Sequence, residues 1–104
     1  MINTIKKFFG IGPRVDLGAL LLKGAIILDV RTPGEYAAGH LKRYTNIPLN
    51  NLHKHLQKLK RDKPIITCCA SGMRSSSAKS ILKANGFLDV HNGGSWQNLK
   101  KYDQ

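Results

Sequence analysis

The stretch PIITCCASGMRSSSAKS, Pro64–Ser80, joins an apolar run to two adjacent cysteines, a loop of small residues and a serine-rich segment. The run PIITC is typical of a strand buried on both faces. The segment SSSAKSILKANG predicts a helix with its apolar side chains inward and Gly86 at its end. A loop just before a helix directs backbone N–H groups and the helix dipole inward, which favours a thiolate. The stretch therefore predicts a strand, an anion-binding loop and a helix around a functional cysteine.

Strand-like and helix-like segments alternate along the rest of the chain. Two further buried strands are predicted, AIILDV (25–30) and FLDVHN (87–92), with a short apolar piece at 46–48. Helices are predicted at DLGALLLKG (16–24), TPGEYAAGH (32–40), LNNLHKHLQKLKR (49–61) and, after a turn, within GGSWQNLKKY (93–102). Strands that alternate with helices in this order imply one α/β domain, a parallel sheet with helices on both faces.

Length and cysteine content narrow the class of protein. A chain of 104 residues forms one small domain. We predict a short N-terminal extension at 1–13 and the domain at 14–104. The start of the chain lacks the pattern of a secretory signal, and no apolar run approaches transmembrane length. Adjacent cysteines form a disulfide only with strained geometry, so we expect free thiols and a cytoplasmic protein.

The charge is strongly positive, with 17 Lys and Arg against 6 Asp and Glu. A solvated basic surface and an anionic partner both explain this excess. Lys54, Lys58, Lys60 and Lys63 gather around one segment, but no aromatic side chains interleave with them as a nucleic-acid stacking platform requires. No strong nucleic-acid signal is present, and no membrane partner is expected.

The two cysteines give two registers for the loop. Counted from Cys68, the sequence reads C-x5-R, the spacing that tyrosine phosphatases use. That pattern also requires a glycine three residues after the cysteine and usually a histidine before it, where this chain has Ser71 and Thr67. Counted from Cys69, Gly72 falls on the glycine position and the loop is one residue shorter. The count favours Cys69 as the nucleophile.

A second polar group is expected beside this loop. Asp29 and Arg31 follow the strand AIIL, and the carboxyl ends of parallel strands meet at one edge of the sheet. A structural role is favoured for Asp29, and for Arg31 a structural and a substrate role stay open. His40 could serve as a base for Cys69, although the family resemblance given below implies a structural role. His53, His55 and His91 have no partner at ligand spacing, so no metal and no cofactor is expected.

The chain from about Asp16 to Trp96 resembles a single-domain rhodanese, a thiosulfate sulfurtransferase. The matching pieces, in order, are LDVRTPGEYAAGHL (28–41), NIPL (46–49), CASGMRS (69–75), SAKSILKANGF (77–87) and the pair Gly93–Gly94. The resemblance implies a five-stranded parallel sheet with helices on both faces and a six-residue active-site loop, where phosphatase relatives have seven residues. The chain departs from the family at Lys42, Arg43 and Tyr44, where relatives commonly have a Pro-Gly turn and a small residue.

The resemblance also implies a chemistry. Cys69 attacks the outer sulfur of a donor such as thiosulfate, and its persulfide passes the sulfur to cyanide or a thiol. Backbone N–H groups of the loop stabilise the persulfide, and Arg74 holds the anionic donor; the substrate-binding residues are Ala70, Ser71, Gly72, Met73, Arg74 and Ser75. Asp29 supports the loop, and Arg31 pairs with Glu35.

Two alternatives stay open beside the sulfurtransferase. One is a carrier domain that hands persulfide sulfur to a partner in a relay, and the other, which the loop count disfavours, is a phosphatase or arsenate reductase. Cys68 is interpreted as a packed strand residue, with the role of a resolving thiol as its alternative. The physiological donor and acceptor cannot be read from a pocket that holds one sulfur.

Overall fold

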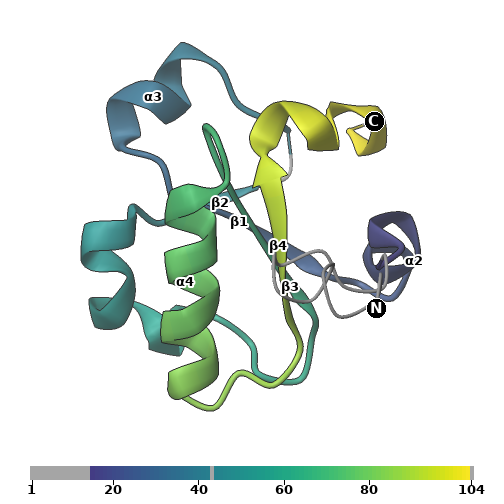
Figure 1. Ribbon diagram of the computed structural model, residues 1–104, viewed down its shortest axis with the longest axis vertical. Coiled ribbons are helices and arrows are strands. Elements are labelled where there is room, and N and C mark those ends of the chain that lie inside the picture. Colours follow the sequence, from purple (N-terminus) through teal and green to yellow (C-terminus); the bar gives the residue numbers. More distant parts are fainter. Residues whose placement is uncertain (1–14, 43, 104) are drawn as a thin grey trace, which may run out of the picture.

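The computed structural model describes residues 15–42 and 44–103, which form a parallel sheet between two layers of helices (Figure 1). Four strands make up the sheet in the order β2-β1-β3-β4. Their bounds are Ile26–Asp29 (β1), Thr45–Asn46 (β2), Ile65–Cys69 (β3) and Val90–Ser95 (β4). All three pairings are parallel, and β3 lies between β1 and β4. The predicted α/β class with a parallel sheet is confirmed, but four strands rather than five lie among the described residues.

Two helices begin with a side-chain cap at their first turn. The helix α2, Leu17–Leu22, starts at Asp16, whose carboxylate accepts the N–H of Ala19. The helix α3, Pro33–Ala38, has Thr32 as its N-cap in a complete capping box with Glu35. Side-chain oxygens at these positions accept N–H groups that have no partner within the helix. The ion-pairing residue Glu35 is therefore held in place by the start of its own helix.

The segment predicted as a helix at 49–61 differs in the structure. It forms two short 3-10 helices, η1 at Leu49–Lys54 and η2 at Leu56–Lys58, separated at His55, which has φ −123°. Side chains three residues apart eclipse in a 3-10 helix, so the spacing of Leu49 and Leu52 suits this geometry as well as an α-helix. The terminal helix is likewise a 3-10 helix, η3 at Trp96–Tyr102.

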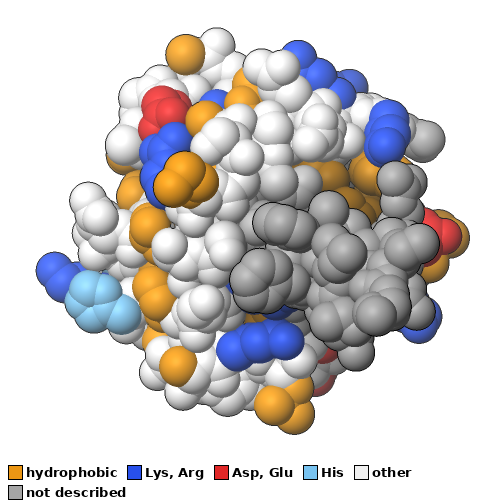
Figure 2. All heavy atoms as spheres, viewed as in Figure 1, with side chains coloured by type: hydrophobic (Ala, Val, Ile, Leu, Met, Phe, Trp, Pro, Cys, Tyr) orange, Lys and Arg blue, Asp and Glu red, His pale blue; other side chains and the backbone are white. Residues whose placement is uncertain are grey.

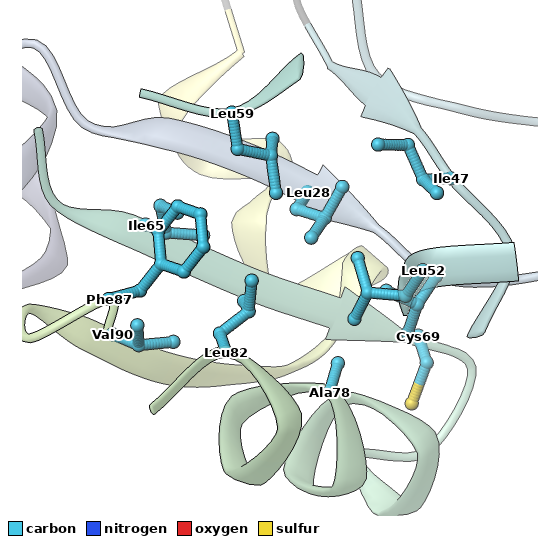
Figure 3. Packing of buried hydrophobic residues seen from close by; sticks show 11 residues of the cluster. Leu28, Ile47, Leu52, Leu59, Ile65, Cys69, Ala78, Leu82, Phe87 and Val90 are labelled. Atoms are coloured by element: carbon cyan, nitrogen blue, oxygen red, sulfur yellow. The ribbon is translucent and has the colours of Figure 1, made fainter. Parts of the chain in front are cut away.

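The two faces of the sheet carry separate cores. On one face, Leu82 of α4 (Met73–Ala84) and Leu52 of η1 pack over Leu28 and Ile65 of the sheet (Figure 3). On the other face, α2 and Leu99 of η3 cover Ile27 and Ile66. Neighbouring residues of a strand point to opposite faces, so β1 and β3 each contribute to both cores. Cys69 belongs to the first core and Cys68 to the second.

At Gly93, β4 lies so close to β3 that a side chain would collide with it. A Cβ atom at this position would lie 2.8 Å from Cγ2 of Ile66 and 3.0 Å from the carbonyl oxygen of Thr67. No side chain fits there without a shift of β3 or of Leu99.

Among the described residues, no helix is long and apolar enough to cross a membrane.

Candidate functional site

The site lies where β3 ends and α4 begins. Only three residues, 70–72, separate Cys69 from Met73, and Gly72 makes the turn with φ +107°, a backbone conformation that favours glycine. The first turn of α4 then follows directly, so N–H groups without a partner inside the helix face the cysteine. Figure 3 shows the sulfur of Cys69 directed at this end of α4. The strand–loop–helix unit predicted from the sequence is present.

Cys69 Sγ is surrounded by hydrogen-bond donors. The N–H of Gly72 donates to it over 2.9 Å, the N–H of Ser75 over 3.4 Å, and Ser75 Oγ lies 3.4 Å away. Burial raises the pKa of the Cys69 thiol, but hydrogen bonds from the Ser75 hydroxyl and from the N–H groups of Ser75, Gly72 and Ser71 outweigh it, so the net pKa is lowered. The arrangement stabilises a thiolate.

The loop residues divide by their exposure. The side chains of Ala70, Ser71 and Met73 are exposed to solvent, and that of Met73 is 79% exposed. The Cys69 side chain itself has 0% exposure and Ser75 is buried beside it. A reactant that meets the sulfur therefore requires the loop or a side chain over it to move.

Arg74 forms an ion pair with Glu35 of α3. Its two terminal nitrogens donate to the two carboxylate oxygens of Glu35 over 2.6 and 2.9 Å. The side-chain hydrogen bonds from Arg74 lower the pKa of Glu35 to about 2, and Glu35 raises the pKa of Arg74. The pair is about one-third exposed on each side. The positive charge nearest the loop is thus already matched by one carboxylate.

The expected pairing of Arg31 with Glu35 is wrong. Arg31 is 4% exposed and pairs with the buried carboxylate of Asp29 over 2.8 Å. It reaches only the carbonyl oxygen of Glu35, over 3.3 Å, and also donates to that of Gly39 over 2.8 Å. The ring of Trp96 stacks 4.4 Å from the Arg31 guanidinium. A buried arginine satisfies its planar donors best on a carboxylate that is also buried, and Asp29 is two residues away.

Asp29 and Arg31 lie beside Cys68 rather than beside Cys69. Asp29 is the register partner of Cys68 across β1 and β3. The hydrogen bonds that Arg31 donates to α3 connect the buried pair to the helix that holds Glu35. The buried pair is thus connected by hydrogen bonds to the helix whose Glu35 pairs with Arg74.

Cys68 occupies an environment opposite to that of Cys69. Burial raises the pKa of the Cys68 thiol to about 12, with a further contribution from the Asp29 carboxylate. Its side chain packs in the core that α2 and η3 cover, and it has 0% exposure. The resolving role for Cys68 is not compatible with this placement, because the backbone of β3 lies between the two sulfurs.

The sequence reasoning missed Asn92, although a signal was available. Asn92 is the last residue of the predicted strand 87–92, and parallel sheets place their sites at the carboxyl ends of strands. In the structure it is the third residue of β4, opposite Thr67 of β3. Its side-chain oxygen accepts a hydrogen bond from Ser75 Oγ over 2.6 Å, and its nitrogen donates to the Gly72 carbonyl over 3.1 Å.

The histidines lie apart from the sulfur. His40 stacks on Tyr36 with ring centroids 4.0 Å apart, and His91 pairs with Asp89. Within residues 15–42 and 44–103, no group of three or more His, Cys, Asp or Glu side chains is arranged to hold a metal ion. On the face seen in Figure 2, Lys and Arg side chains lie in separate small groups rather than in one continuous band.

Comparisons with known proteins agree with the geometry. The family model described as "Rhodanese-like domain" matches residues 15–101. The thiosulfate sulfurtransferase GlpE of Pseudomonas entomophila is 32% identical over 87 residues, which cover 84% of this chain and 79% of that protein. The human single-domain sulfurtransferase TSTD1 superposes with a TM-score of 0.72 and 26% identity, over 85% of this chain and 92% of that chain. The chain belongs to the rhodanese-like domain family.

Other relatives are longer than the match. A tRNA uridine(34) hydroxylase of Pelagibacter ubique is 39% identical over 83 residues, which cover 75% of this chain but 28% of that protein. An uncharacterized protein of Bacillus subtilis, YqhL, is 35% identical over 68 residues, 65% of this chain. The chain spans about half of that relative's length, 54%. The same domain thus occurs alone and as a part of larger enzymes.

Proposed function

We propose that the protein is a sulfurtransferase in which Cys69 carries the sulfur. The observation that supports this most directly is the set of donors around Cys69 Sγ. The sulfur accepts hydrogen bonds from the N–H groups of Gly72 and Ser75, within a six-residue loop. Family membership and the GlpE relative support the same class of activity. A thiolate at this position combines the two properties that the chemistry needs, nucleophilicity and a site that holds negative charge.

The proposed reaction has two steps with thiosulfate as the donor. The Cys69 thiolate attacks the outer sulfur of thiosulfate, the S–S bond breaks, and sulfite leaves with the electron pair. A persulfide anion remains on Cys69, stabilised by the N–H groups at the start of α4. Cyanide or a thiolate then attacks the outer sulfur, forms thiocyanate or a new persulfide, and regenerates the Cys69 thiolate.

Arg74 is proposed to receive the anionic donor. It is the one described guanidinium at the loop that is not buried, and it lies 35% exposed in its pair with Glu35. To bind a dianion, Arg74 exchanges Glu35 for the donor, so the ion pair competes with substrate binding. Ala70, Ser71, Met73 and the remaining loop residues supply backbone N–H groups and the rim of the site. Two free thiols suit a reducing cytoplasm.

A carrier role is the second candidate. It is favoured by the occurrence of the domain as 28% of a larger tRNA-modifying relative, where it is one part of a longer chain. In this version the persulfide on Cys69 passes to a specific partner protein rather than to a small thiophile. Both versions share the first step and differ only in the acceptor.

Intact-mass analysis tests the proposal. Reduced, folded protein incubated with thiosulfate and no acceptor is expected to gain one sulfur, located on Cys69 by fragmentation and removed by cyanide. A Cys69→Ser variant is expected to gain none, and a Cys68→Ser variant is expected to gain the same sulfur. Slow discharge to cyanide with fast discharge to one protein favours the carrier. An unmodified Cys69 together with turnover of a phosphate ester overturns the proposal in favour of a phosphatase.

A further inference from the structure

Asn92 connects β4 to both sides of the cysteine loop. Its Oδ1 accepts hydrogen bonds from Ser75 Oγ over 2.6 Å and from the N–H of Gly94 over 2.9 Å. Its Nδ2 donates to the carbonyl oxygen of Gly72 over 3.1 Å. Gly72 and Ser75 both donate N–H groups to Cys69 Sγ. A single side chain outside the loop thus contacts two of the residues that surround the sulfur.

The orientation of the Asn92 amide follows from its backbone partners. The Gly94 N–H can only donate, so the amide oxygen must face it. The Gly72 carbonyl can only accept, so the amide nitrogen must face that side. Oδ1 therefore also faces Ser75, and because it carries no proton, the 2.6 Å contact requires the Ser75 hydroxyl to be the donor.

Ser75 has one hydroxyl proton and three acceptors within reach. Besides Asn92 Oδ1, these are the Gly72 carbonyl at 3.0 Å and Cys69 Sγ at 3.4 Å. When the proton lies on the Asn92 side, Ser75 Oγ presents lone pairs to the sulfur and accepts from the Cys69 thiol. A thiolate instead needs the Ser75 proton directed at the sulfur. The shortest of the three contacts is the one to Asn92, so in the resting arrangement the Ser75 proton lies on the Asn92 side, and the N–H groups of Gly72 and Ser75 are the donors that face the sulfur.

We propose that Asn92 is a positioning residue that competes with Cys69 for the hydroxyl proton of Ser75 and thereby sets how readily the thiol ionises. When the thiolate forms, and later the persulfide anion, the Ser75 hydroxyl turns its proton from Asn92 Oδ1 toward the sulfur. The inference rests on Cys69 as the reacting thiol of the proposed function. Its test measures ionisation and not sulfur transfer, so the two can fail separately.

Few charged groups face Cys69 besides this network. Arg74, from the same helix, is paired with Glu35 of α3. Cys68 is the neighbouring titratable group in β3, and its thiol stays protonated on the other face of the sheet. The acidic side chain nearest to Asn92 in sequence is the exposed Asp89, just before β4, and it pairs with His91. These groups are unchanged by substitution at Asn92, so they stay constant through the test.

The test follows the pH dependence of iodoacetamide alkylation of Cys69 in the full chain with Cys68→Ala, from about pH 5 to about pH 10. Asn92→Ala frees the Ser75 proton for the sulfur and is expected to lower the midpoint by about one unit, a roughly tenfold larger thiolate fraction below it. Asn92→Asp keeps the acceptor, adds a negative charge and is expected to raise the midpoint by about the same amount.

The opposite signs distinguish this proposal from a merely structural role, because a loosened loop would move both variants in the same direction. A Ser75→Ala background provides the matched control, since the effect of Asn92→Ala is expected to vanish there. Asn92 is exposed, so both variants are expected to fold, and Asn92→Asp preserves its shape. Shifts of the same sign, an unchanged midpoint, or an Asn92→Ala shift that persists without the Ser75 hydroxyl would overturn the proposal.

Discussion

Cys68 and Cys69 are adjacent in β3, but they lie on opposite faces of the strand and their pKa values are shifted in opposite directions. On the face that α4 covers, Cys69 Sγ meets N–H groups of Gly72 and Ser75, and its pKa is lowered despite burial. On the face that α2 and η3 cover, Cys68 meets apolar side chains and a carboxylate, and its pKa rises to about 12. Both side chains are equally inaccessible, at 0% exposure.

Burial alone therefore does not decide whether a thiol is inert or reactive. The difference comes from what replaces water around the sulfur, which is a set of oriented donors on one side and hydrocarbon on the other. Because successive side chains of a strand point to opposite faces of the sheet, two adjacent residues can lie in entirely different environments. The following predictions test this contrast, beginning with the largest effect.

Exchange of each sulfur for oxygen gives the largest contrast. We expect Cys69→Ser to lower kcat/KM for thiosulfate and cyanide by a factor on the order of a thousand or more, because the nucleophile is lost. Cys68→Ser is expected to retain most of the turnover while the free energy of unfolding falls by about 1–3 kcal/mol, since its hydroxyl enters an apolar core. Steady-state kinetics and urea unfolding measure the two effects. Loss of turnover in a folded Cys68→Ser protein would show that the loop register is wrong.

The packing on the Cys68 face is tested at Gly93. An added methyl group would lie 2.8 Å from Cγ2 of Ile66 and 3.3 Å from Cδ1 of Leu99, so we expect Gly93→Ala to lower the free energy of unfolding by about 1–3 kcal/mol. Gly34→Ala is the matched control, because nothing lies within 4 Å of its added carbon. Equal stability of the two variants in urea would mean that this core is looser than its contacts indicate.

Charge recognition on the Cys69 face is tested at Arg74. Loss of one charge-assisted hydrogen bond to the donor corresponds to a KM for thiosulfate that is roughly tenfold higher in Arg74→Ala. An uncharged sulfane-sulfur donor is expected to suffer less. Glu35→Gln removes the competing carboxylate and is expected to lower the KM for thiosulfate. Equal losses with both donors in Arg74→Ala would assign Arg74 to holding the loop rather than the substrate.

The smallest effect is the alkaline loss of stability caused by Cys68. Its pKa rises from 9.0 to about 12 on folding, so between these values the unfolded chain releases a proton that the folded chain keeps. Stability therefore falls as pH rises through this window, by about 1 kcal/mol at about pH 10. Cys68→Ala is expected to flatten this part of the unfolding profile. A slope identical to that of the parent would mean that the folded thiol titrates normally.

Local patterns predicted much of this molecule and non-local pairings did not. The cap at Thr32, the turn at Gly72 and the loop between Cys69 and Arg74 follow from short stretches of sequence, because each depends on neighbours within a few residues. The partner of Glu35 depends on how α3 meets α4, which no local spacing shows. Asn92 escaped notice for the same reason, since it acts on a loop 17 residues away.

The segment at 49–61 shows a different limit. Its leucines are spaced three and four apart, and this pattern fits both an α-helix and successive 3-10 turns. Asn50, Asn51 and His53 are poor helix formers, so the tertiary packing of Leu52 and Leu59 decides the local backbone. The implied fifth strand is not among the described residues, and residues 1–14 lie outside them.

The opposed directions of the two cysteines have a consequence for the fate of a bound sulfur atom. A persulfide next to a second accessible thiol decays by forming a disulfide and expelling hydrogen sulfide. Here the backbone of β3 separates the two sulfurs, so Cys68 cannot contact a persulfide on Cys69, and its raised pKa keeps it protonated. Self-discharge is therefore blocked within the chain. Under the proposed function, a sulfur atom on Cys69 is therefore removed by an external acceptor, and its lifetime depends on which molecules can reach the loop.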